Sequence, residues 1–459
     1  MHELVIRGGT LITPSGPRAA DLAVEDGVIA AIAAELPGAL TEIDARGLSV
    51  FPGLIDAHVH FNEPGRADWE GAATGSRALA AGGGTLFFDM PLNSSPCTVG
   101  PREFHEKYEA LKQASVTDFA MWGGLVPGNR DVLSELAALG VVGFKAFMTD
   151  SGLDDFPRAD DLTLYEGMRE AARLGLPVAV HAESQELTLM LGRRTAANGR
   201  HEIRDYLDSR PVLAELEAIE RATLFAFETG AKLHIVHVSS GKGVVLAAEA
   251  RSRGADVSIE TCPHYLCFIE DDMLQLGAVA KCAPPLRSAA TQESLWTALL
   301  DGMIDIVASD HSPAPPQMKE SSDFFRVWGG IAGVQSTLAA LLKEGHHRRG
   351  VPLPEIARLT SGSPARRFSI SRKGSIEIGM DADLTLADLD ARFTLQAEDL
   401  HQKHRFSPYI GKQFRGVVRR TLVRGVTVFH DGAIIPAHGR FVRPDLTIEA
   451  THATVRTHA

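Results

Sequence analysis

The stretch FPGLIDAHVH, residues 51–60, ends in three ionisable side chains placed two residues apart. The residues before them are apolar, which predicts a buried strand. Side chains two apart project to the same face of a strand, so Asp56, His58 and His60 share one face at its carboxyl end. Such a pair of histidines also occurs as hydrogen-bonded core residues, so the rest of the chain has to decide between structure and chemistry.

Three further apolar runs end in a potential metal ligand. His181 ends PVAVHAE, His237 lies late in HIVHVSS, and Asp310 ends DIVASDHS. Each alone is compatible with a core histidine or a helix-capping aspartate. Together they bring imidazole and carboxylate groups from several strand ends to one rim, which favours a metal site. Such ligands suit zinc and related ions, and two ions in one site can clamp an attacking oxygen.

Lys145 lies inside the apolar run VVGFKAFM, where a lysine is rarely buried unless it is paired or modified. An ion pair with an acidic neighbour and a side chain that reaches the rim are two alternatives. In a third, burial lowers the pKa of the lysine and leaves a neutral, nucleophilic amine. Such an amine could capture carbon dioxide as a carbamate, whose two oxygens could bridge two cations. The sequence leaves all three interpretations open.

These residues need a scaffold that places strand ends side by side. Apolar runs alternate with helical patterns through the middle of the chain, as expected of βα units around a parallel sheet. They fit an α/β fold of the (β/α)₈ TIM-barrel type better than an open doubly wound sheet, and the active site of such a barrel lies at the carboxyl ends of its strands. The eight predicted strands are GLIDAHVH, TLFFDMP, DFAMWGGLV, VVGFKAFM, PVAVHAE, KLHIVHVSS, DVSIETCPH and DIVASDHS.

The two ends of the chain have strand–turn–strand patterns instead, and LVIRGGTLI near the start resembles TLVRGVTVF near the end. We therefore expect a small β-sandwich domain built from residues 1–50 and 371–459, with the barrel over residues 51–370 inserted between them. The segment after Pro444 is polar and irregular, and is expected to be a tail that is either poorly ordered or packed on a neighbour. Within the barrel, residues 184–230 are too many for one helix and are expected to hold two.

The composition argues against several classes of protein. The chain has 459 residues, a net charge of −12 and no basic cluster, which argues against a nucleic-acid or anionic-membrane partner. Its four cysteines are too few for a disulfide framework and are expected to be reduced thiols. We find no signal-type segment and no run of membrane-spanning length. We expect a soluble, cytoplasmic protein.

The order of the candidate ligands along the chain is similar to that of a known superfamily. The chain resembles the binuclear-metal amidohydrolases in this order. It has an HxH pair on predicted strand one, a lysine on strand four, histidines on strands five and six, and an aspartate on strand eight. Within them the chain resembles the cyclic amidohydrolases, most closely the allantoinase group, over nearly its whole length, including GSIEIGMDADLTL. The most specific motifs are HVHFNEPGRADWEG, FFDMPLNSSPCT, GFKAFM, HAES, HVSS, CPHY, KCAPPLR, SDHSPAPP and WGGIAG.

The resemblance implies a cofactor and a mechanism. It implies two divalent metal ions, zinc by default with cobalt or manganese as alternatives, and carbon dioxide to carboxylate Lys145 at its Nζ. A hydroxide shared by the two ions would attack a ring amide carbonyl, with Asp310 as general base and then acid. The implied metal ligands are His58, His60, Lys145, His181, His237 and Asp310.

Two positions bear on the choice between sister activities. Dihydroorotases typically have an arginine two residues after the second histidine, where this chain has Asn62, although Arg66 lies nearby and keeps that activity open. Dihydropyrimidinases and hydantoinases usually have a tyrosine five residues after the carboxylated lysine, where this chain has Asp150. The pattern favours allantoin, a cyclic ureide, as the substrate, with the other cyclic amides as the alternative.

Amide and hydroxyl groups suit a substrate with many donors and acceptors. We therefore expect the backbone of Cys282 and Ala283 to pair with the ring amide, and the side chains of Asn62, Asn93 and Ser312 to bind the rest. Asn and Ser beside proline also stabilise turns, which is the alternative for Asn93 and Ser312.

Two other classes of protein belong to the same superfamily. A non-enzymatic scaffold related to dihydropyrimidinase would have lost metal ligands, and the complete ligand set argues against it. A metal-dependent deaminase would normally lack the bridging lysine, so Lys145 argues against that class. The resemblance also implies a homo-oligomer, most often a tetramer.

Overall fold

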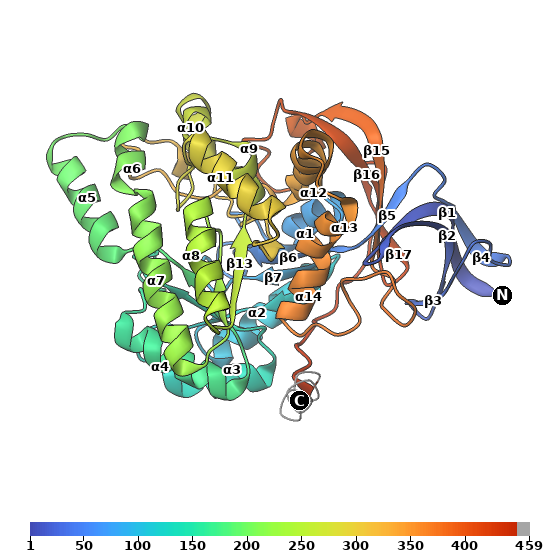
Figure 1. Cartoon of the computed structure of the whole chain (residues 1–459), viewed down its shortest axis with the longest axis horizontal. Coiled ribbons are helices and arrows are strands. Elements are labelled where there is room, and N and C mark those ends of the chain that lie inside the picture. Colours follow the sequence, from blue (N-terminus) through green and yellow to red (C-terminus); the bar gives the residue numbers. More distant parts are fainter. Residues whose placement is uncertain (448–459) are drawn as a thin grey trace.

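Strands from both ends of the chain join in one sheet. The computed structural model describes residues 1–447, so most of the tail predicted after Pro444 lies outside the described residues. Nine strands form this sheet: β1 (His2–Thr13), β2 (Gly16–Glu25), β3 (Val28–Ala33), β4 (Ala39–Asp44), β5 (Ser49–Pro52), β15 (Leu384–Thr394), β16 (Gln413–Val423), β17 (Val426–His430) and β18 (Ala433–Ile434). β5 pairs in parallel with β1 and antiparallel with β15, and thereby joins the two chain ends (Figure 1).

The middle of the chain forms two parallel sheets, in the orders β6-β7-β8 and β14-β13-β12-β11-β10-β9. Their strands are β6 (Leu54–Val59), β7 (Gly84–Asp89), β8 (Asp118–Met121), β9 (Gly123–Gly124), β10 (Phe144–Phe147), β11 (Val178–His181), β12 (Leu233–Ile235), β13 (Val257–Thr261) and β14 (Ile306–Val307). Each of the eight predicted stretches contains a strand, and the third contains two, β8 and β9. The predicted α/β class with parallel strands is confirmed.

The two parallel sheets are neighbours at both of their edges. Only Trp122 separates β8 from β9, and its Nε1 donates to the carbonyl oxygen of Ala57 at 3.0 Å. At the other edge Val59 and His311 form a parallel bridge, and the main-chain N of His60 donates to the carbonyl oxygen of His311 at 2.8 Å. These contacts bring the end of β6 beside the segment that follows β14.

Helices follow most of the parallel strands and cover them (Figure 1). None of the helices in residues 1–447 is long and apolar enough to cross a membrane. Short 3₁₀ and π segments also occur, the longest being the π-helical residues 341–347. The α-helices are α1 (Ala72–Ala81), α2 (Pro101–Ala114), α3 (Leu133–Leu139), α4 (Asp161–Leu174), α5 (Gln185–Ala197), α6 (Ile203–Ser209), α7 (Val212–Thr229), α8 (Gly241–Ser252), α9 (Pro263–Cys267), α10 (Glu270–Leu276), α11 (Ala289–Leu300), α12 (Thr337–Ala340), α13 (Leu353–Ala357) and α14 (Ser363–Arg367).

The helix α4 illustrates why these segments fold as they do. The side chain of Asp160 caps its first turn by accepting from the main-chain N of Thr163 at 2.8 Å. Gly175 ends it with a left-handed φ of 72°, which glycine adopts without strain. Leu164 and Met168 lie one turn apart on its buried face. The apolar residues that recur along this segment therefore form the face of the helix that packs against the protein.

The prediction of two helices in residues 184–230 is wrong, because this segment contains three. Gly199, with φ 66°, follows the end of α5, and Pro211 stands immediately before α7. These two helix-ending positions isolate the short α6, whose first main-chain donors are satisfied by a capping box between Glu202 and Asp205. Sequence periodicity alone did not separate so short a helix from its neighbours.

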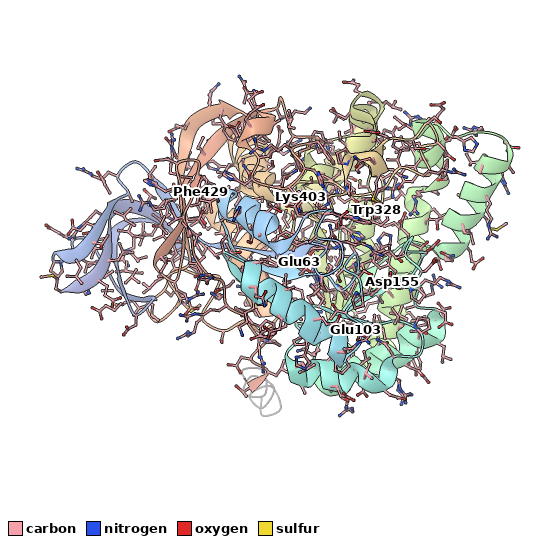
Figure 2. All side chains as sticks on the ribbon, turned by 180° about the vertical axis from the view of Figure 1, so that it is seen from behind. Glu63, Glu103, Asp155, Trp328, Lys403 and Phe429 are labelled. Carbon is pink, nitrogen blue, oxygen red and sulfur yellow. The ribbon has the colours of Figure 1, made fainter. Side chains whose placement is uncertain are left out.

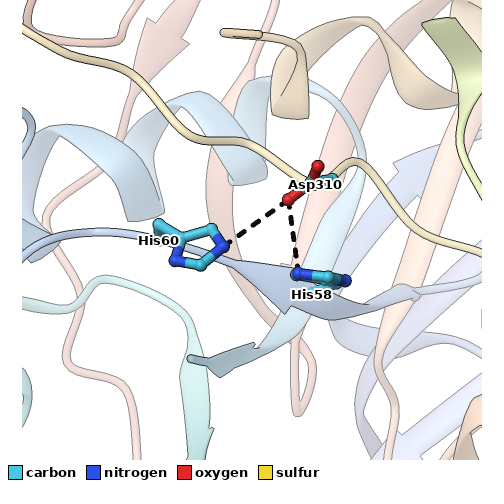
Figure 3. Close-up of side chains that lie close together, drawn as sticks. All are labelled: His58, His60 and Asp310. Carbon is cyan, nitrogen blue, oxygen red and sulfur yellow. Dashed lines mark ion pairs between the residues drawn. The ribbon is translucent and has the colours of Figure 1, made fainter. Parts of the chain in front are cut away.

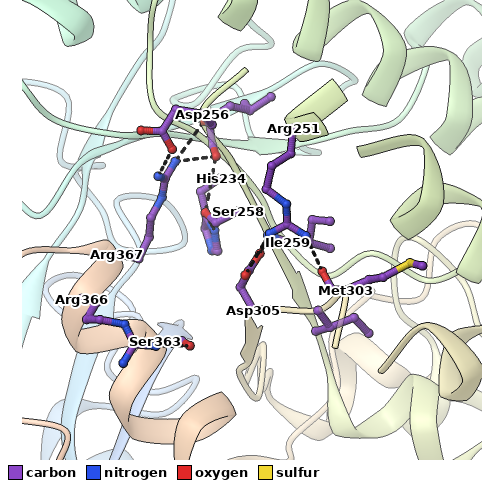
Figure 4. A network of polar contacts seen from close by, with 12 residues as sticks. His234, Arg251, Asp256, Ser258, Ile259, Met303, Asp305, Ser363, Arg366 and Arg367 are labelled. Carbon is purple, nitrogen blue, oxygen red and sulfur yellow. Dashed lines mark hydrogen bonds and ion pairs between the residues drawn. The ribbon is translucent and has the colours of Figure 1, made fainter. Parts of the chain in front are cut away.

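A network of ion pairs fastens helices to the amino ends of the parallel strands (Figure 4). Asp305, just before β14, accepts from Nη1 of Arg251 at 2.8 Å and from the main-chain N of Ile259 at 2.9 Å. Arg367 pairs with Asp256 and donates to the carbonyl oxygen of Leu233 at 2.7 Å. These ion pairs lie at the amino ends of the strands, on the side opposite the carboxyl ends that carry the predicted ligands.

A buried charge cluster and an apolar contact join the nine-stranded sheet to the parallel strands. Lys373 Nζ lies 2.9 Å from Oδ2 of Asp118 at the start of β8, and it also pairs with Asp383 just before β15. Phe429 of β17, labelled in Figure 2, belongs to a cluster of apolar residues that includes Ala81 of α1. The two parts therefore share both a polar and an apolar contact.

Two lysines hold the backbone of residues 324–330 in one shape. Lys281 Nζ donates to three carbonyl oxygens at 2.6 to 3.3 Å, those of Phe324, Phe325 and Val327. Lys319 Nζ donates to three more at 2.8 to 3.2 Å, those of Ala278, Trp328 and Gly330. Burial lowers the pKa of both lysines to about 7. Each nitrogen is nevertheless matched by three acceptors, the number that an ammonium group can serve, and these oxygens favour the charged form.

Replacing Lys281 by methionine is expected to loosen this segment, because methionine fills similar space but leaves three carbonyl oxygens without a donor. Arg326, with a side chain that is 83% exposed, marks the segment for trypsin. We expect trypsin to cleave the native Lys281→Met variant after Arg326 about tenfold faster than the wild type, since unmet buried acceptors cost about 1–3 kcal/mol. The exposed Lys242→Met is the control, and equal cleavage rates in the two variants would contradict the assignment.

Candidate functional site

Three predicted ligands converge at the carboxyl ends of the parallel strands. His58 lies in β6, His60 follows it, and Asp310 follows β14. The Nε2 atoms of His58 and His60 lie 3.2 and 3.5 Å from the same oxygen, Oδ1 of Asp310 (Figure 3). One potential ligand atom from each residue lies within 4.8 Å of the others. Two imidazole nitrogens and a carboxylate oxygen this close together could hold a divalent metal ion.

A buried carboxylate orients His58 from behind. Oε1 of Glu260 accepts from Nδ1 of His58 at 2.9 Å, and Oε2 accepts from Nε2 of His234 at 3.1 Å. Burial would raise the pKa of Glu260, but its two imidazole partners outweigh this effect and lower the pKa to about 2. With its proton on Nδ1, His58 presents the lone pair of Nε2 toward Asp310, the arrangement usual for a metal-ligating histidine.

The second pair of predicted ligands lies beside the first. The rings of His181 and His237 are 4.6 Å apart between centroids, and His237 is 5.4 Å from His58. Nε2 of His181 pairs with Oε2 of Glu183 at 2.7 Å, which leaves its Nδ1 available. Nδ1 of His237 is buried and has no hydrogen-bond partner among the described residues. Burial lowers the pKa of both histidines and so favours the neutral form that binds metals.

Lys145 of β10 is fully buried, and its Nζ has no hydrogen-bond partner in residues 1–447. Burial lowers its pKa to about 7, although the nearby charge of Asp310 opposes this shift. The nitrogen lies 5.0 Å from the centroid of Phe147, a ring that stacks on His181 at 4.5 Å. Neither of the two alternatives, an ion pair or a side chain that reaches the rim, is present in the described part of the chain. An amine without a partner, which is partly neutral near pH 7, thus lies near the histidines.

His264 is a candidate ligand that was not predicted from the sequence. With Cys262 and Asp310 it forms a second group whose ligand atoms lie within 4.8 Å of one another. Its Nε2 is buried and has no partner among the described residues, and burial lowers its pKa to about 4. Burial also raises the pKa of the Cys262 thiol well above its usual range, which disfavours the thiolate that a metal requires. The group with the two strand-end histidines is therefore the better metal site.

Backbone conformation around these ligands is unusual. Four non-glycine residues that the sequence singled out have a left-handed φ: Asn62 (63°), Asn93 (69°), His237 (41°) and Asp310 (46°). This conformation costs free energy for residues with a Cβ and tends to occur at functional sites. Each of the four residues lies two to four positions after the end of a parallel strand, where the chain turns.

A cavity of about 470 Å³ lies against the predicted ligands, five of which line it: His58, His60, His181, His237 and Asp310. Its lining also includes four of the five predicted substrate-binding residues, which are Asn93, Cys282, Ala283 and Ser312. Asn62 is not among the lining residues, and its Nδ2 donates to the carbonyl oxygen of Pro313 at 3.3 Å. The geometry therefore favours a structural role for Asn62 behind the wall rather than contact with a substrate.

Polar groups on the cavity wall are tied to one another. Nδ2 of Asn93 lies 3.4 Å from Oγ of Ser312, and the hydroxyl of Tyr206 donates to the carbonyl oxygen of Cys282 at 2.8 Å. Arg66 is the residue that kept dihydroorotase activity open as an alternative. It does not line the cavity. Its Nη1 donates to the carbonyl oxygen of Asn93 at 3.2 Å, on the back of the same loop.

The residues that orient the ligands were also not predicted from the sequence. Glu260 and Glu183 hold His58 and His181, and Arg210 pairs with Glu183. A signal was present, since Glu260 lies inside the apolar run DVSIETCPH and Glu183 comes two residues after His181. A buried carboxylate without a positive partner nearby in the sequence predicts a partner from elsewhere in the fold.

Comparisons with known proteins show which family the chain is similar to. The model of the amidohydrolase family matches residues 49–428. An allantoinase of Solibacter usitatus is 63% identical over 452 residues, covering 98% of this chain and 99% of its own. An allantoinase of Rubrobacter xylanophilus is 57% identical, covering 96% and 98% of the two chains. Among solved structures, an L-hydantoinase (dihydropyrimidinase) of Arthrobacter aurescens has a TM-score of 0.94 at 34% identity and covers 96% of this chain and 100% of its own.

The family model matches most of the chain, and the relatives match it almost from end to end. The match includes every strand end that carries a predicted ligand, from His58 to Asp310. The protein is a member of the amidohydrolase family.

Proposed function

We propose that the protein is an allantoinase, a hydrolase that opens the ring amide of allantoin to give allantoate in purine catabolism. The observation that carries the proposal is that five of the six predicted metal ligands and four predicted substrate-binding residues line one cavity. Relatives named allantoinase at 63% and 57% identity support the choice of substrate. In this reaction water adds to the ring carbonyl, the carbon–nitrogen bond breaks, and the nitrogen takes up a proton.

The residues present fit two divalent metal ions, with zinc as the first choice and cobalt or manganese as alternatives. His58, His60 and Asp310 would hold one ion, and His181 and His237 the other. The fit rests on ligand atoms that have no other buried partner, such as Nδ1 of His237 and Nζ of Lys145. When bound, two such ions supply Lewis acidity toward water and toward the amide carbonyl.

We further propose that Lys145 is N6-carboxylated and lies between the two sets of histidines. Its Nζ would form a bond to the carbon of carbon dioxide and release one proton, which leaves a carbamate with two oxygens. The support is that the amine is fully buried, has no partner among residues 1–447 and has its pKa lowered to about 7 by burial. A neutral amine is the form that reacts.

Asp310 would be the catalytic residue that moves the proton. Its Oδ1 lies 3.2 Å from Nε2 of His58 and 3.5 Å from Nε2 of His60. Burial would raise the pKa of this carboxyl, but the surrounding imidazoles hold the pKa far below its usual range. Asp310 is therefore ionised and able to accept a proton from the attacking water. The same oxygen would then donate that proton to the leaving ring nitrogen.

The cavity wall would hold the substrate ring. The backbone of Cys282 and Ala283 would pair with the ring amide, and the side chains of Asn93 and Ser312 would bind further polar atoms, because all four line the cavity. Asn62 would act indirectly through its contact with Pro313.

We infer that the two parallel sheets close into one (β/α)₈ barrel of the TIM type over residues 51–370. The bridge between Val59 and His311 and the continuity through Trp122 support closure. We infer equally that residues 1–50 and 371–459 form a β-sandwich domain, supported by the pairing of β5 with β15. A crystal structure with a gap between β6 and β14 would contradict the closed barrel.

We also propose a homotetramer in the cytoplasm that acts on a small cyclic ureide. The resemblance to cyclic amidohydrolases supports the oligomer, and the similarity to a solved L-hydantoinase extends over its whole length. All four cysteines are free thiols, as expected in a reducing compartment. Sedimentation at the mass of a single chain would contradict the tetramer.

Hydrolysis of hydantoins is the second candidate function, because the L-hydantoinase structure superimposes with a TM-score of 0.94. The decisive experiment compares allantoin, hydantoin, dihydrouracil and dihydroorotate as substrates of the metal-loaded protein. We expect allantoin to have the highest kcat/KM. A higher value for any of the other three would overturn the proposed function and leave the family assignment intact.

Asp310→Asn is expected to retain the fold but lose turnover by at least about a hundredfold, the range for removal of a general acid–base group. The asparagine amide has the shape of the carboxylate and cannot accept the proton. Thermal unfolding and steady-state kinetics on allantoin check the two parts. Near-normal turnover would exclude Asp310 from proton transfer.

Lys145→Ala is expected to lose bound metal and activity together, because the bridging anion would be missing. Metal content after gentle purification is the first readout, and rescue of metal binding by added short-chain carboxylic acids is the second. Lys107→Ala, which removes another buried lysine that is paired with Asp89, is a control for loss of fold. Full metal content in Lys145→Ala without rescue would disprove the carbamate.

A further inference from the structure

We propose that Gln185 and Asp150 form a subsite for the ureido arm of the substrate, an inference that rests on the proposed function. Both residues line the cavity. Asp150 lies five residues beyond Lys145 of β10, and Gln185 lies four residues beyond His181 of β11. Short connections from neighbouring strands therefore place the pair beside the predicted metal ligands.

The orientation of the Gln185 amide is determined by its neighbours. The main-chain N of Asp150 donates to Oε1 of Gln185 at 2.8 Å, and Oγ1 of Thr149 donates to the same oxygen at 2.9 Å. Oγ1 of Thr188 lies 3.0 Å from the Thr149 hydroxyl and extends the chain. A main-chain N–H can only donate, so the atom that faces it must be the amide oxygen and not the amide nitrogen.

Nε2 of Gln185 consequently lies on the side away from these donors. No acceptor contacts it within residues 1–447, so both of its N–H groups are available to the cavity that the side chain lines. If Gln185 served only to tie the loop after β10 to the start of α5, its oxygen alone would be needed. The unused donor is what points to a ligand.

Asp150 supplies the opposite polarity. Its Oδ1 accepts from the main-chain N of Gly152 at 3.0 Å, which holds the carboxylate in place. The side chain forms no ion pair in the described part of the chain, and the nearby Arg210 is already paired with Glu183. The cavity thus has a carboxylate acceptor next to an amide donor.

A ureido group matches this pair of side chains. It has one carbonyl oxygen and several N–H groups on the same plane, so the oxygen can accept from Nε2 of Gln185 while the N–H groups donate to Asp150. Hydrogen bonds to a carboxylate are the stronger kind. A ring without the arm would leave the subsite to water, so the pair would select a ureido-substituted ring over unsubstituted hydantoin.

The test exchanges donor and acceptor. Gln185→Glu keeps an oxygen that can accept from the main-chain N of Asp150 and from Thr149, but it removes the N–H donor to the ureido arm. Asp150→Asn keeps an oxygen that can accept from the main-chain N of Gly152, but it removes the oxygen that would accept from the ureido arm. We expect each variant to lower kcat/KM for allantoin by about tenfold, mainly through KM, because each loses one hydrogen bond to the ureido arm. The kcat/KM for hydantoin and the metal content should stay within about twofold of the wild type. The unfolding temperature should stay within a few degrees of the wild type.

The double variant separates recognition from structure. Combining Asp150→Asn with Gln185→Glu places a donor where the acceptor was and an acceptor where the donor was, so a ureido arm turned around can again pair with both side chains. We expect its kcat/KM for allantoin to exceed that of both single variants, a coupling that a purely structural tie would not produce. Control variants Asp154→Asn and Asn198→Asp make charge changes of the same size outside the cavity lining.

The outcomes distinguish this inference from the proposed function. Wild-type protein that does not hydrolyse allantoin overturns the proposed function, and the subsite with it. The subsite alone is overturned if both single variants hydrolyse allantoin as fast as the wild type. It is also overturned if the two variants lose activity on hydantoin as much as on allantoin. A double variant whose kcat/KM for allantoin does not exceed that of both single variants also overturns it.

Discussion

Burial of several ligand-type side chains in one place is the constraint on which the rest of the structure depends. The Nε2 atoms of His58 and His60 lie 3.2 and 3.5 Å from Oδ1 of Asp310. All three residues are nearly inaccessible to solvent. Such groups are costly to bury unless something compensates them. The fold meets this cost with a second layer of carboxylates, of which Glu260 behind His58 and Glu183 behind His181 are the main members.

The division of labour between the two ends of the strands follows from that constraint. At the amino ends, residues such as Arg251 and Asp305 fasten helices to strands. At the carboxyl ends the ionisable groups are left with unused atoms, including Nδ1 of His237 and Nζ of Lys145. Stability is thus supplied away from the site, and the strained left-handed residues can be tolerated where the chain turns.

Much of the cavity wall comes from a different part of the molecule from the predicted ligands. The predicted ligands come from strands or the residues shortly after them. The rest of the cavity wall comes largely from α5, from the loops after β7, β10 and β14, and from the segment held by Lys281 and Lys319. Loops can change without disturbing the strands that carry the ligands. This explains how the chain shares a closely similar fold with an L-hydantoinase at only 34% identity.

The sequence by itself determined the class of fold, the eight stretches that contain the parallel strands and the six candidate ligands, because apolar runs and the period of two along a strand are local properties. It did not separate the short α6 from its neighbours, and it placed Asn62 on the cavity wall. Only the tertiary structure decided that Glu260 orients His58 from 202 residues away, and that Oε1 of Gln185 faces a main-chain donor. Those facts depend on which distant groups meet in space, and a hydrogen bond is defined by the distance and direction between two atoms rather than by their spacing along the chain.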